Sequence, residues 1–256
     1  MQDLFDLSGK VAVAIGGNGV LGGEIAKAFA EYGAKVAIVG RNMEKAEEVT
    51  KEIEANGGTA KSFQADVSDL ATVENAAKEI EEWAGGWDII LNAPGMNSPT
   101  PFFDLKPEEW DQIMDVNLRG VVFATQIFAK RMVEQERKGS IINISSVSST
   151  TPLSKVFTYS ASKASMNNVT QFLAREFAPN GIRVNAIIPG FFPAEQNRKI
   201  LSEDRVAQIM NHTPMDRFGE PEELKGAAIY LASDKASGFV TGSFLRVDGG
   251  FGSMTI

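Results

Sequence analysis

Tyr159 and Lys163 are the two residues of this chain whose types and spacing best suit proton transfer. They stand four positions apart, so a helix places both side chains on one face. An ammonium group beside a phenol favours the phenolate and lowers the tyrosine pKa from about 10 toward neutral pH. The same spacing also occurs on ordinary helix surfaces. The residues around the pair must therefore decide between proton transfer and a plain surface.

A glycine-rich loop, residues 16–23, reads Gly-Gly-Asn-Gly-Val-Leu-Gly-Gly. It follows a buried strand at residues 11–15 and precedes an amphipathic helix at residues 21–32. Glycines at this point allow a tight turn and a close approach of the backbone to a pyrophosphate, and the helix N-terminus supplies free N–H groups. Glycine-rich turns are common without any ligand. The position between strand and helix nevertheless predicts dinucleotide binding.

The end of the second strand reads Val39-Gly40-Arg41-Asn42 and contains no carboxylate. An acidic residue there would accept hydrogen bonds from the ribose 2′-hydroxyl of NAD(H). Arg41 instead favours a 2′-phosphate by charge pairing, so NADP(H) is favoured over NAD(H). The alternative is that Arg41 stacks on adenine or points to solvent.

Short β-branched segments alternate with longer amphipathic segments along the chain. Strands are expected at residues 11–15, 35–39, 60–65, 88–91, 140–144, 183–188 and 244–247. Helices are expected at 21–32, 42–56, 69–83, 158–178 and 220–231, with a long helix from about 107 that breaks near Asn117. This order predicts an α/β fold. We expect one Rossmann-type domain over residues 1–256, a doubly wound parallel sheet of about seven strands with helices on both faces. Residues 190–214, an irregular and partly helical insertion, would be its substrate loop.

An eight-stranded α/β barrel has a similar length, but its first loop need not be rich in glycine.

Composition excludes several classes of protein. The 256 residues contain no cysteine, which excludes disulfides, iron–sulfur ligation and thiol catalysis and is compatible with a reducing cytoplasm. His212 is the only histidine, which argues against a Ser-His-Asp hydrolase and a histidine-rich metal site, and we predict no metal. The net charge of −8 disfavours nucleic acid and anionic membrane surfaces as partners. Residues 1–10 do not resemble a secretory signal, and no stretch is long and apolar enough to span a membrane, so a cytoplasmic location is expected.

Several motifs in order along the chain resemble the classical short-chain dehydrogenase/reductases. The resemblance covers nearly the whole length and rests on the glycine loop, Asp66-Val67, Asn92-Ala93-Pro94-Gly95, Asn117, Ser145-Ser146, Tyr159 to Lys163, Pro189-Gly190 and Val247-Asp248-Gly249-Gly250.

The resemblance implies a catalytic set. The family's catalytic serine precedes the tyrosine by thirteen residues, which points to Ser146 rather than Ser145. During reduction, Tyr159 would protonate the developing alkoxide, Ser146 would hydrogen-bond the same oxygen, and Lys163 would lower the tyrosine pKa and hold the ribose. Asn117 would hold a relay water. Taken singly, Asn117 could be a helix breaker and Ser146 a plain loop serine.

The resemblance also implies contacts with the cofactor and an assembly. Asp66 and Val67 match the pair that contacts adenine, although Asp66 could simply cap a helix. A homotetramer is implied, with the helices after Pro107 and around Tyr159 as an interface. Together with the glycine loop and the second strand, the predicted cofactor-binding set is Gly16, Asn18, Gly19, Val20, Leu21, Gly22, Arg41, Asn42, Asp66, Val67, Asn92, Ala93, Gly95, Tyr159, Lys163, Pro189 and Gly190.

Three positions depart from the family pattern. Val20 replaces the middle glycine of the loop, Pro94 replaces an alanine, and Ala194 stands where a threonine usually bonds the nicotinamide carboxamide. The last difference puts one carboxamide contact in doubt. None of the three belongs to the proton-transfer set.

A narrower resemblance rests on Gly19 to Gly22, Pro189 to Phe192, Glu195 to Arg198, His212 to Met215 and Arg217 to Glu223. These segments are similar to the D-mannonate oxidoreductase (fructuronate reductase) branch, more closely in the second half of the chain, and members of that branch act on a keto-hexuronate or the matching aldonate. Such a small-molecule substrate needs cations and amides around its carboxylate and hydroxyls. Arg198 is the candidate for the carboxylate, Asn97 for a hydroxyl and Ser146 for the reacting oxygen, while Lys155 is also available. The alternatives are a gluconate 5-dehydrogenase-like enzyme, a 3-oxoacyl-carrier-protein reductase-like enzyme and a non-enzymatic dinucleotide sensor.

Overall fold

The computed structural model describes residues 4–193 and 202–254, and within them seven parallel strands form one sheet. The order across the sheet is β3-β2-β1-β4-β5-β6-β7. The strands are β1 (Val11–Ile15), β2 (Lys35–Gly40), β3 (Thr59–Gln64), β4 (Ile89–Asn92), β5 (Gly139–Ile144), β6 (Ile182–Pro189) and β7 (Phe244–Val247). The predicted doubly wound parallel sheet is confirmed.

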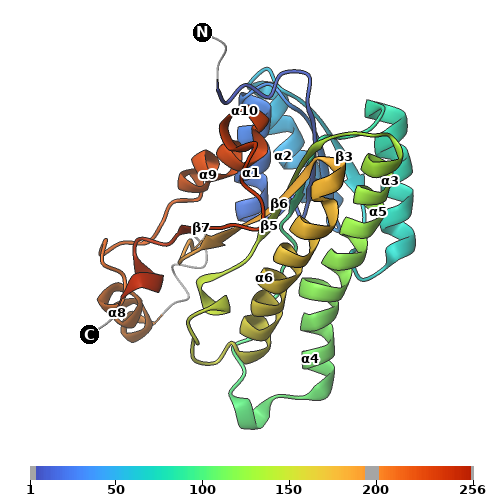
Figure 1. Ribbon diagram of the computed structural model, residues 1–256. Coiled ribbons are helices and arrows are strands. Elements are labelled where there is room, and N and C mark those ends of the chain that lie inside the picture. Colours follow the sequence, from blue (N-terminus) through green and yellow to red (C-terminus); the bar gives the residue numbers. More distant parts are fainter. Residues whose placement is uncertain (1–3, 194–201, 255–256) are drawn as a thin grey trace.

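Helices cover both faces of the sheet (Figure 1). One face carries α1 (Val20–Glu31), α2 (Met43–Ala55) and α9 (Lys225–Ala232). The other carries α3 (Leu70–Ala84), α5 (Val121–Glu134) and α6 (Phe157–Phe177). The shorter helices α4 (Pro107–Met114), α8 (Glu203–Asn211) and α10 (Asp234–Ser237) lie toward the ends of the sheet, and no helix of the described residues is both long and apolar enough to cross a bilayer.

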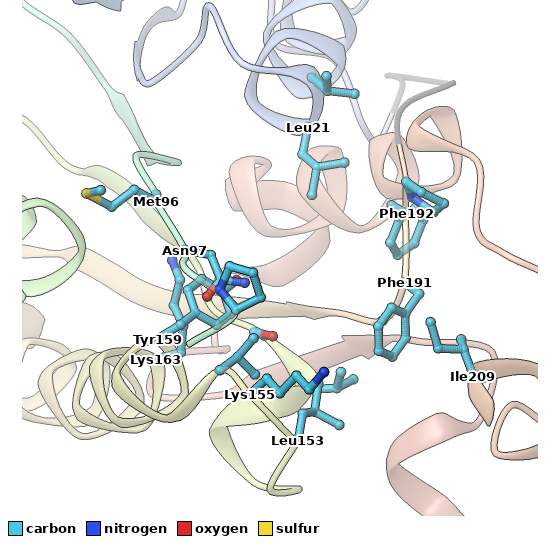
Figure 2. Close-up of a pocket in the computed structure, with 18 of the residues that line it drawn as sticks. Leu21, Met96, Asn97, Leu153, Lys155, Tyr159, Lys163, Phe191, Phe192 and Ile209 are labelled. Atoms are coloured by element: carbon cyan, nitrogen blue, oxygen red, sulfur yellow. The ribbon is translucent and has the colours of Figure 1, made fainter. Parts of the chain in front are cut away.

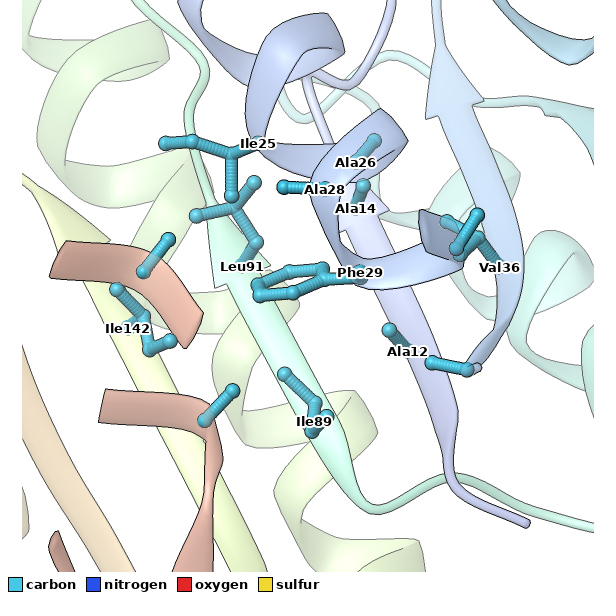
Figure 3. Packing of buried hydrophobic residues seen from close by; sticks show 14 of the residues in the cluster. Ala12, Ala14, Ile25, Ala26, Ala28, Phe29, Val36, Ile89, Leu91 and Ile142 are labelled. Atoms are coloured by element: carbon cyan, nitrogen blue, oxygen red, sulfur yellow. The ribbon is translucent and has the colours of Figure 1, made fainter. Parts of the chain in front are cut away.

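Strand β1 shows why the two faces differ. All five of its residues are buried, which is expected for a central parallel strand. Because successive side chains point to opposite faces, Ala12 and Ala14 meet α1, while Val11, Val13 and Ile15 meet the other helix layer. The small alanines leave room for Phe29 of α1, which is fully buried against them (Figure 3).

The break predicted near Asn117 is present as a six-residue π-helical segment, Asp115–Gly120, between α4 and α5. Such segments occur mostly as local bulges in α-helices, often at functional sites. Gly120 ends the segment, and a Cβ atom there would lie only 2.6 Å from the Val67 carbonyl oxygen. The bulge therefore lets the helix pass close to the end of β3 while Asn117 turns inward.

Strand register brings the candidate residues to one edge of the sheet. Ile15 pairs with Asn92, and Asn92 pairs with Asn143. The next residues along these strands, Gly16, Ala93 and Ile144, therefore lie at the same carboxyl edge. The strand order reverses between β1 and β4, which is where open α/β sheets bind ligands.

Candidate active site

A cavity of about 1120 Å³ opens at this edge of the sheet (Figure 2). Tyr159, Lys163 and Asn97 lie on one wall of it, and Phe191, Phe192 and Ile209 lie on the opposite wall. Of the predicted site residues, those that line the cavity are Gly19, Val20, Leu21, Gly22, Ala93, Gly95, Asn97, Ser146, Tyr159, Lys163 and Gly190. The structure thus gathers the predicted catalytic side chains and the glycine loop around one space.

The glycine loop has the geometry of a cradle for a dinucleotide. Gly16 has φ +77°, and a Cβ atom on it would lie 2.7 Å from the carbonyl carbon of Ala93. A Cβ atom on Gly22 would lie 2.4 Å from the Gly16 carbonyl oxygen. Gly19 is the N-cap of α1 and offers no side-chain hydrogen bond, so the first N–H groups of the helix face the cavity wall without a protein side chain as cap. These residues fit a pyrophosphate group.

Ser146, and not its neighbour Ser145, faces the cavity. The Ser146 Oγ accepts hydrogen bonds from the backbone N–H (3.1 Å) and the hydroxyl (3.0 Å) of Ser148, which leaves its own proton to donate. The Ser145 hydroxyl donates instead to Asn167 Oδ1 at 2.6 Å and is buried. The geometry therefore agrees with the choice made from the spacing to Tyr159.

Lys163 is buried beside Tyr159 on α6. Its Nζ donates to the Ile144 carbonyl oxygen at 2.8 Å and lies 5.7 Å from the centre of the Tyr159 ring. Burial lowers the pKa of Lys163 to about 8. A Cβ atom on Gly95 would lie 3.9 Å from Nζ, so the segment after β4 passes within van der Waals distance of the ammonium.

The expected lowering of the Tyr159 pKa is not found. Burial raises the pKa of the phenol above its usual value, and a hydrogen bond with Ser146 opposes this rise only in part. The reason is that Tyr159 and Lys163 share one poorly solvated environment, which penalises the phenolate as well as the ammonium. The phenol is accordingly a proton donor at neutral pH.

Asn117 is fully buried behind the catalytic residues. Its side-chain amide pairs with the backbone of Met96, accepting from N–H and donating to C=O, both at 2.8 Å. Its Nδ2 also donates to Ser162 Oγ at 3.1 Å, and Ser162 Oγ donates to the Tyr159 carbonyl oxygen at 2.7 Å. Asn117 thereby ties the segment after β4 to the helix that carries Tyr159.

A second group of predicted cofactor residues lies outside the cavity, at the ends of β2 and β3. Arg41 is 79% exposed, and its guanidinium lies 3.6 Å from Asp66. Hydrogen bonds from the Ser68 hydroxyl and backbone hold the pKa of Asp66 below its usual range, with a further contribution from Arg41. Asn42 caps α2, and Asn18 donates to the Asn42 carbonyl oxygen at 3.4 Å. Val67 is buried in the core.

Asn92, another predicted cofactor-binding residue, lies behind the cavity. Its side chain is buried in the sheet and donates to Thr125 Oγ1 and to Asn143 Oδ1, both at 2.8 Å. It joins β4 to β5 and α5 and does not line the cavity. Pro189, the last residue of β6, is likewise buried, while Arg198 and Ala194 fall outside the described residues.

Sequence reasoning missed the contribution of α8. Arg205, Gln208 and Ile209 line the cavity and lie on one helix face, three and four residues apart. The Ser202 side chain caps α8 by accepting a hydrogen bond from the Arg205 N–H. A serine at this position predicts the start of a helix in the sequence. The four-residue spacing between Arg205 and Ile209 would then have placed both side chains on one face of that helix.

Residues 18–252 match a family model described as enoyl-(acyl carrier protein) reductase. A relative from Bacillus subtilis (strain 168), the uncharacterized oxidoreductase UxuB, is 42% identical over 267 residues that cover 96% of each chain. The chain belongs to the short-chain dehydrogenase/reductase family. Its predicted resemblance is confirmed, and this family member is an oxidoreductase that acts on alcohol groups.

Two solved structures of the family show which ligands its relatives hold. A provisionally named D-mannonate oxidoreductase from Haemophilus influenzae with bound NAD is 38% identical, with a TM-score of 0.94 and coverage of 98% of this chain and 97% of the other. A gluconate 5-dehydrogenase from Burkholderia cenocepacia J2315, in complex with NADP and tartrate, is 35% identical, with a TM-score of 0.93 and 99% coverage of both. The relatives thus include sugar-acid enzymes and use either nicotinamide dinucleotide.

Proposed function

We propose that this short-chain dehydrogenase/reductase transfers hydride between NADP(H) or NAD(H) and the keto or secondary alcohol group of a sugar acid of the fructuronate/D-mannonate type. The observation that carries the proposal is one cavity lined by Ser146, Tyr159, Lys163 and the glycine loop. The similarity to a D-mannonate oxidoreductase supports the substrate class.

The residues of the chain would act on the substrate oxygen. A bound nicotinamide supplies a hydride to the carbonyl carbon or accepts it in the reverse direction. As the C=O π bond breaks, Tyr159 transfers its phenolic proton to that oxygen, and Ser146 donates a hydrogen bond to it. The positive charge of Lys163, 5.7 Å from the Tyr159 ring, stabilises the phenolate until it takes up a proton from solvent, and Asn117 positions the helix that carries both residues.

NADP(H) remains our favoured cofactor. Arg41 is the cation at the end of β2, and its exposed guanidinium leaves it free to approach a 2′-phosphate. Asp66 is its present partner and would compete with that phosphate. The preference is therefore expected to be moderate, which agrees with relatives that hold NADP or NAD.

Gluconate 5-dehydrogenase activity is the second candidate. The relative from Burkholderia cenocepacia supports it, because its overall fold is equally close to this chain. A fatty-acyl thioester fits the cavity less well, since Lys155, Arg205 and Asn97 make part of its wall polar and cationic.

One assay set separates these activities. The purified protein would be given NADPH or NADH with fructuronate, tagaturonate, 5-ketogluconate and an acetoacetyl thioester, and cofactor oxidation would be followed by absorbance. We expect turnover of a uronate, with a lower KM for NADPH than for NADH. Turnover of the thioester alone would remove the sugar-acid proposal, and turnover of 5-ketogluconate alone would select the second candidate.

The remaining expectations belong to the same proposal. We propose a homotetramer in the cytoplasm, residues 190–214 as the substrate loop, and Arg198 as a substrate contact. The exposed Phe172, with a groove of about 1030 Å³ between α5 and α6, supports an interface along these helices. Size-exclusion chromatography with light scattering would measure the assembly.

A further inference from the structure

Two cations from separate elements line the substrate end of the cavity. Lys155 comes from the loop that connects Ser146 to Tyr159, and Arg205 comes from α8. Figure 2 shows the Lys155 side chain extending between the Tyr159 wall and the wall that contains Phe191. Neither cation belongs to the glycine loop or to the proton-transfer set.

A hydrogen bond joins Arg205 to the segment that carries Lys155. Arg205 Nη1 donates to Ser154 Oγ at 3.1 Å and to Gln208 Oε1 at 3.3 Å. Ser154 is the residue next to Lys155, so this bond fixes the guanidinium beside the Lys155 segment. Both bonds use Nη1, and among the described residues no hydrogen bond or ion pair engages Nη2 or Nε. An arginine anchored in this way still offers donors for a carboxylate.

The backbone at Lys155 supports a functional reason for this placement. Lys155 has φ +66°, a left-handed conformation that residues with a side chain seldom adopt and that often occurs at functional sites. Its side chain is exposed to the cavity and has no ion-pair partner in the part of the chain that the structure describes. A strained turn therefore directs an unpaired ammonium into the substrate space.

The charge of the cavity is opposite to that of the protein. The chain as a whole carries −8. The described lining residues nevertheless include three cations, Lys155, Lys163 and Arg205, and one carboxylate, Asp204. Positive charge concentrated in a cleft attracts an anionic substrate and gives a neutral competitor no such advantage.

We propose that Lys155 and Arg205 together bind the carboxylate of the substrate while its carbonyl carbon lies at Tyr159 and Ser146. This inference rests on the proposed function and names the two residues that would select an acid over a neutral sugar. The guanidinium would provide a planar pair of donors, and the ammonium a point charge.

The first test compares a charged substrate with its uncharged counterpart. Lys155→Gln and Arg205→Gln would each be assayed with NADPH and either fructuronate or fructose, which lacks the carboxylate. We expect each change to raise the KM for fructuronate about tenfold or more, because a charge-assisted hydrogen bond is lost. The kcat, the KM for NADPH and the weak reduction of fructose should stay within about threefold.

Matched variants keep this test specific. Lys51→Gln removes one exposed charge on α2 and should leave every constant unchanged, while Arg205→Lys should recover part of the affinity. An unchanged KM for fructuronate in both glutamine variants would overturn the proposal. If the KM for NADPH rises while the KM for fructuronate does not, the two cations belong to the cofactor site, and the proposal is overturned as well.

A binding measurement separates this inference from the proposed function. Tartrate, a small hydroxy-dicarboxylate, would be titrated by calorimetry into the protein with NADP⁺. If the wild-type protein reduces no sugar acid but binds tartrate, and both variants bind it at least about tenfold more weakly, the carboxylate site stands while the proposed substrate fails. Equal tartrate binding by wild type and variants would refute the carboxylate site whatever the enzyme reduces.

Discussion

The cofactor side and the substrate side of the cavity differ in what lines them, and we call them the cofactor wall and the substrate wall. The cofactor wall is made by backbone packed on backbone, where Gly16 and Gly22 leave no space for a side chain. The substrate wall is made by side chains of the 150–156 loop, Phe191 and α8. Tyr159 and Lys163 stand between the two. A wall of backbone tolerates little change, whereas a wall of side chains can change specificity by substitution without disturbing the hydride-transfer geometry.

Removal of the Tyr159 hydroxyl, between the cofactor wall and the substrate wall, should have the largest effect on activity. We expect Tyr159→Phe to lower kcat by about 10²–10⁴-fold, because the proton donor is lost while neither wall is altered. The Kd for NADPH, measured by fluorescence titration, should stay within about twofold. Tyr32→Phe, which removes the hydroxyl of an exposed tyrosine, is the matched control and should keep full activity. Near wild-type turnover in the Tyr159 variant would contradict the role of Tyr159 as proton donor.

The cofactor wall can be tested by adding one methyl group. Gly22→Ala places a Cβ atom 2.4 Å from the Gly16 carbonyl oxygen, so the loop must shift. We expect a loss of about 3 kcal/mol in the free energy of unfolding and weaker binding of NADPH, both measured by titration.

Gly226→Ala is the control for this substitution. No heavy atom lies within 4 Å of a Cβ atom there, and alanine is favoured in a helix, so stability should be equal or higher. If Gly22→Ala is as stable as the wild type and binds NADPH equally, the cofactor wall is less rigid than its contacts indicate.

The same contrast explains what the sequence could predict. Periodicity predicted the seven strands and the main helices, and the break near Asn117 appeared as the π-helical segment. The glycine loop was predicted because backbone approach demands a particular residue type. Arg205 was missed because its position depends on how α8 packs against the cavity.

Two further differences concern the direction of side chains and the balance of solvation. Whether Asn92 faces the cavity or the sheet depends on partners, Thr125 and Asn143, that lie far from it in the chain. The pKa of Tyr159 depends on burial, which raises it by more than the hydrogen bond with Ser146 lowers it. Both properties depend on residues that are distant in the chain, so neither follows from the local sequence pattern.

The smallest expected effect concerns Lys163, and it is a change in the free energy of unfolding and not only in the rate. Burial lowers its pKa from 10.5 to about 8, so the folded protein keeps a buried ammonium below pH 8. That shift corresponds to at most about 3 kcal/mol, and the loss of the bond to Ile144 offsets part of it. We expect the free energy of unfolding of Lys163→Met to be about 1–2 kcal/mol higher than that of the wild type at pH 7, and we expect the variant to lose activity.

The pH dependence of this gain distinguishes charge from packing. The folded wild-type protein loses its proton as pH rises through 8, whereas the unfolded chain holds it up to 10.5, so wild-type stability rises relative to the variant over this interval. The gap between the two proteins should therefore close by about pH 10 in urea unfolding. Lys51→Met, at an exposed site, should show little gap at either pH. A difference in the free energy of unfolding that persists at pH 10 would mean that the methionine packs better than the lysine. A variant less stable than the wild type at pH 7 would mean that the Lys163 ammonium is well solvated beside Tyr159.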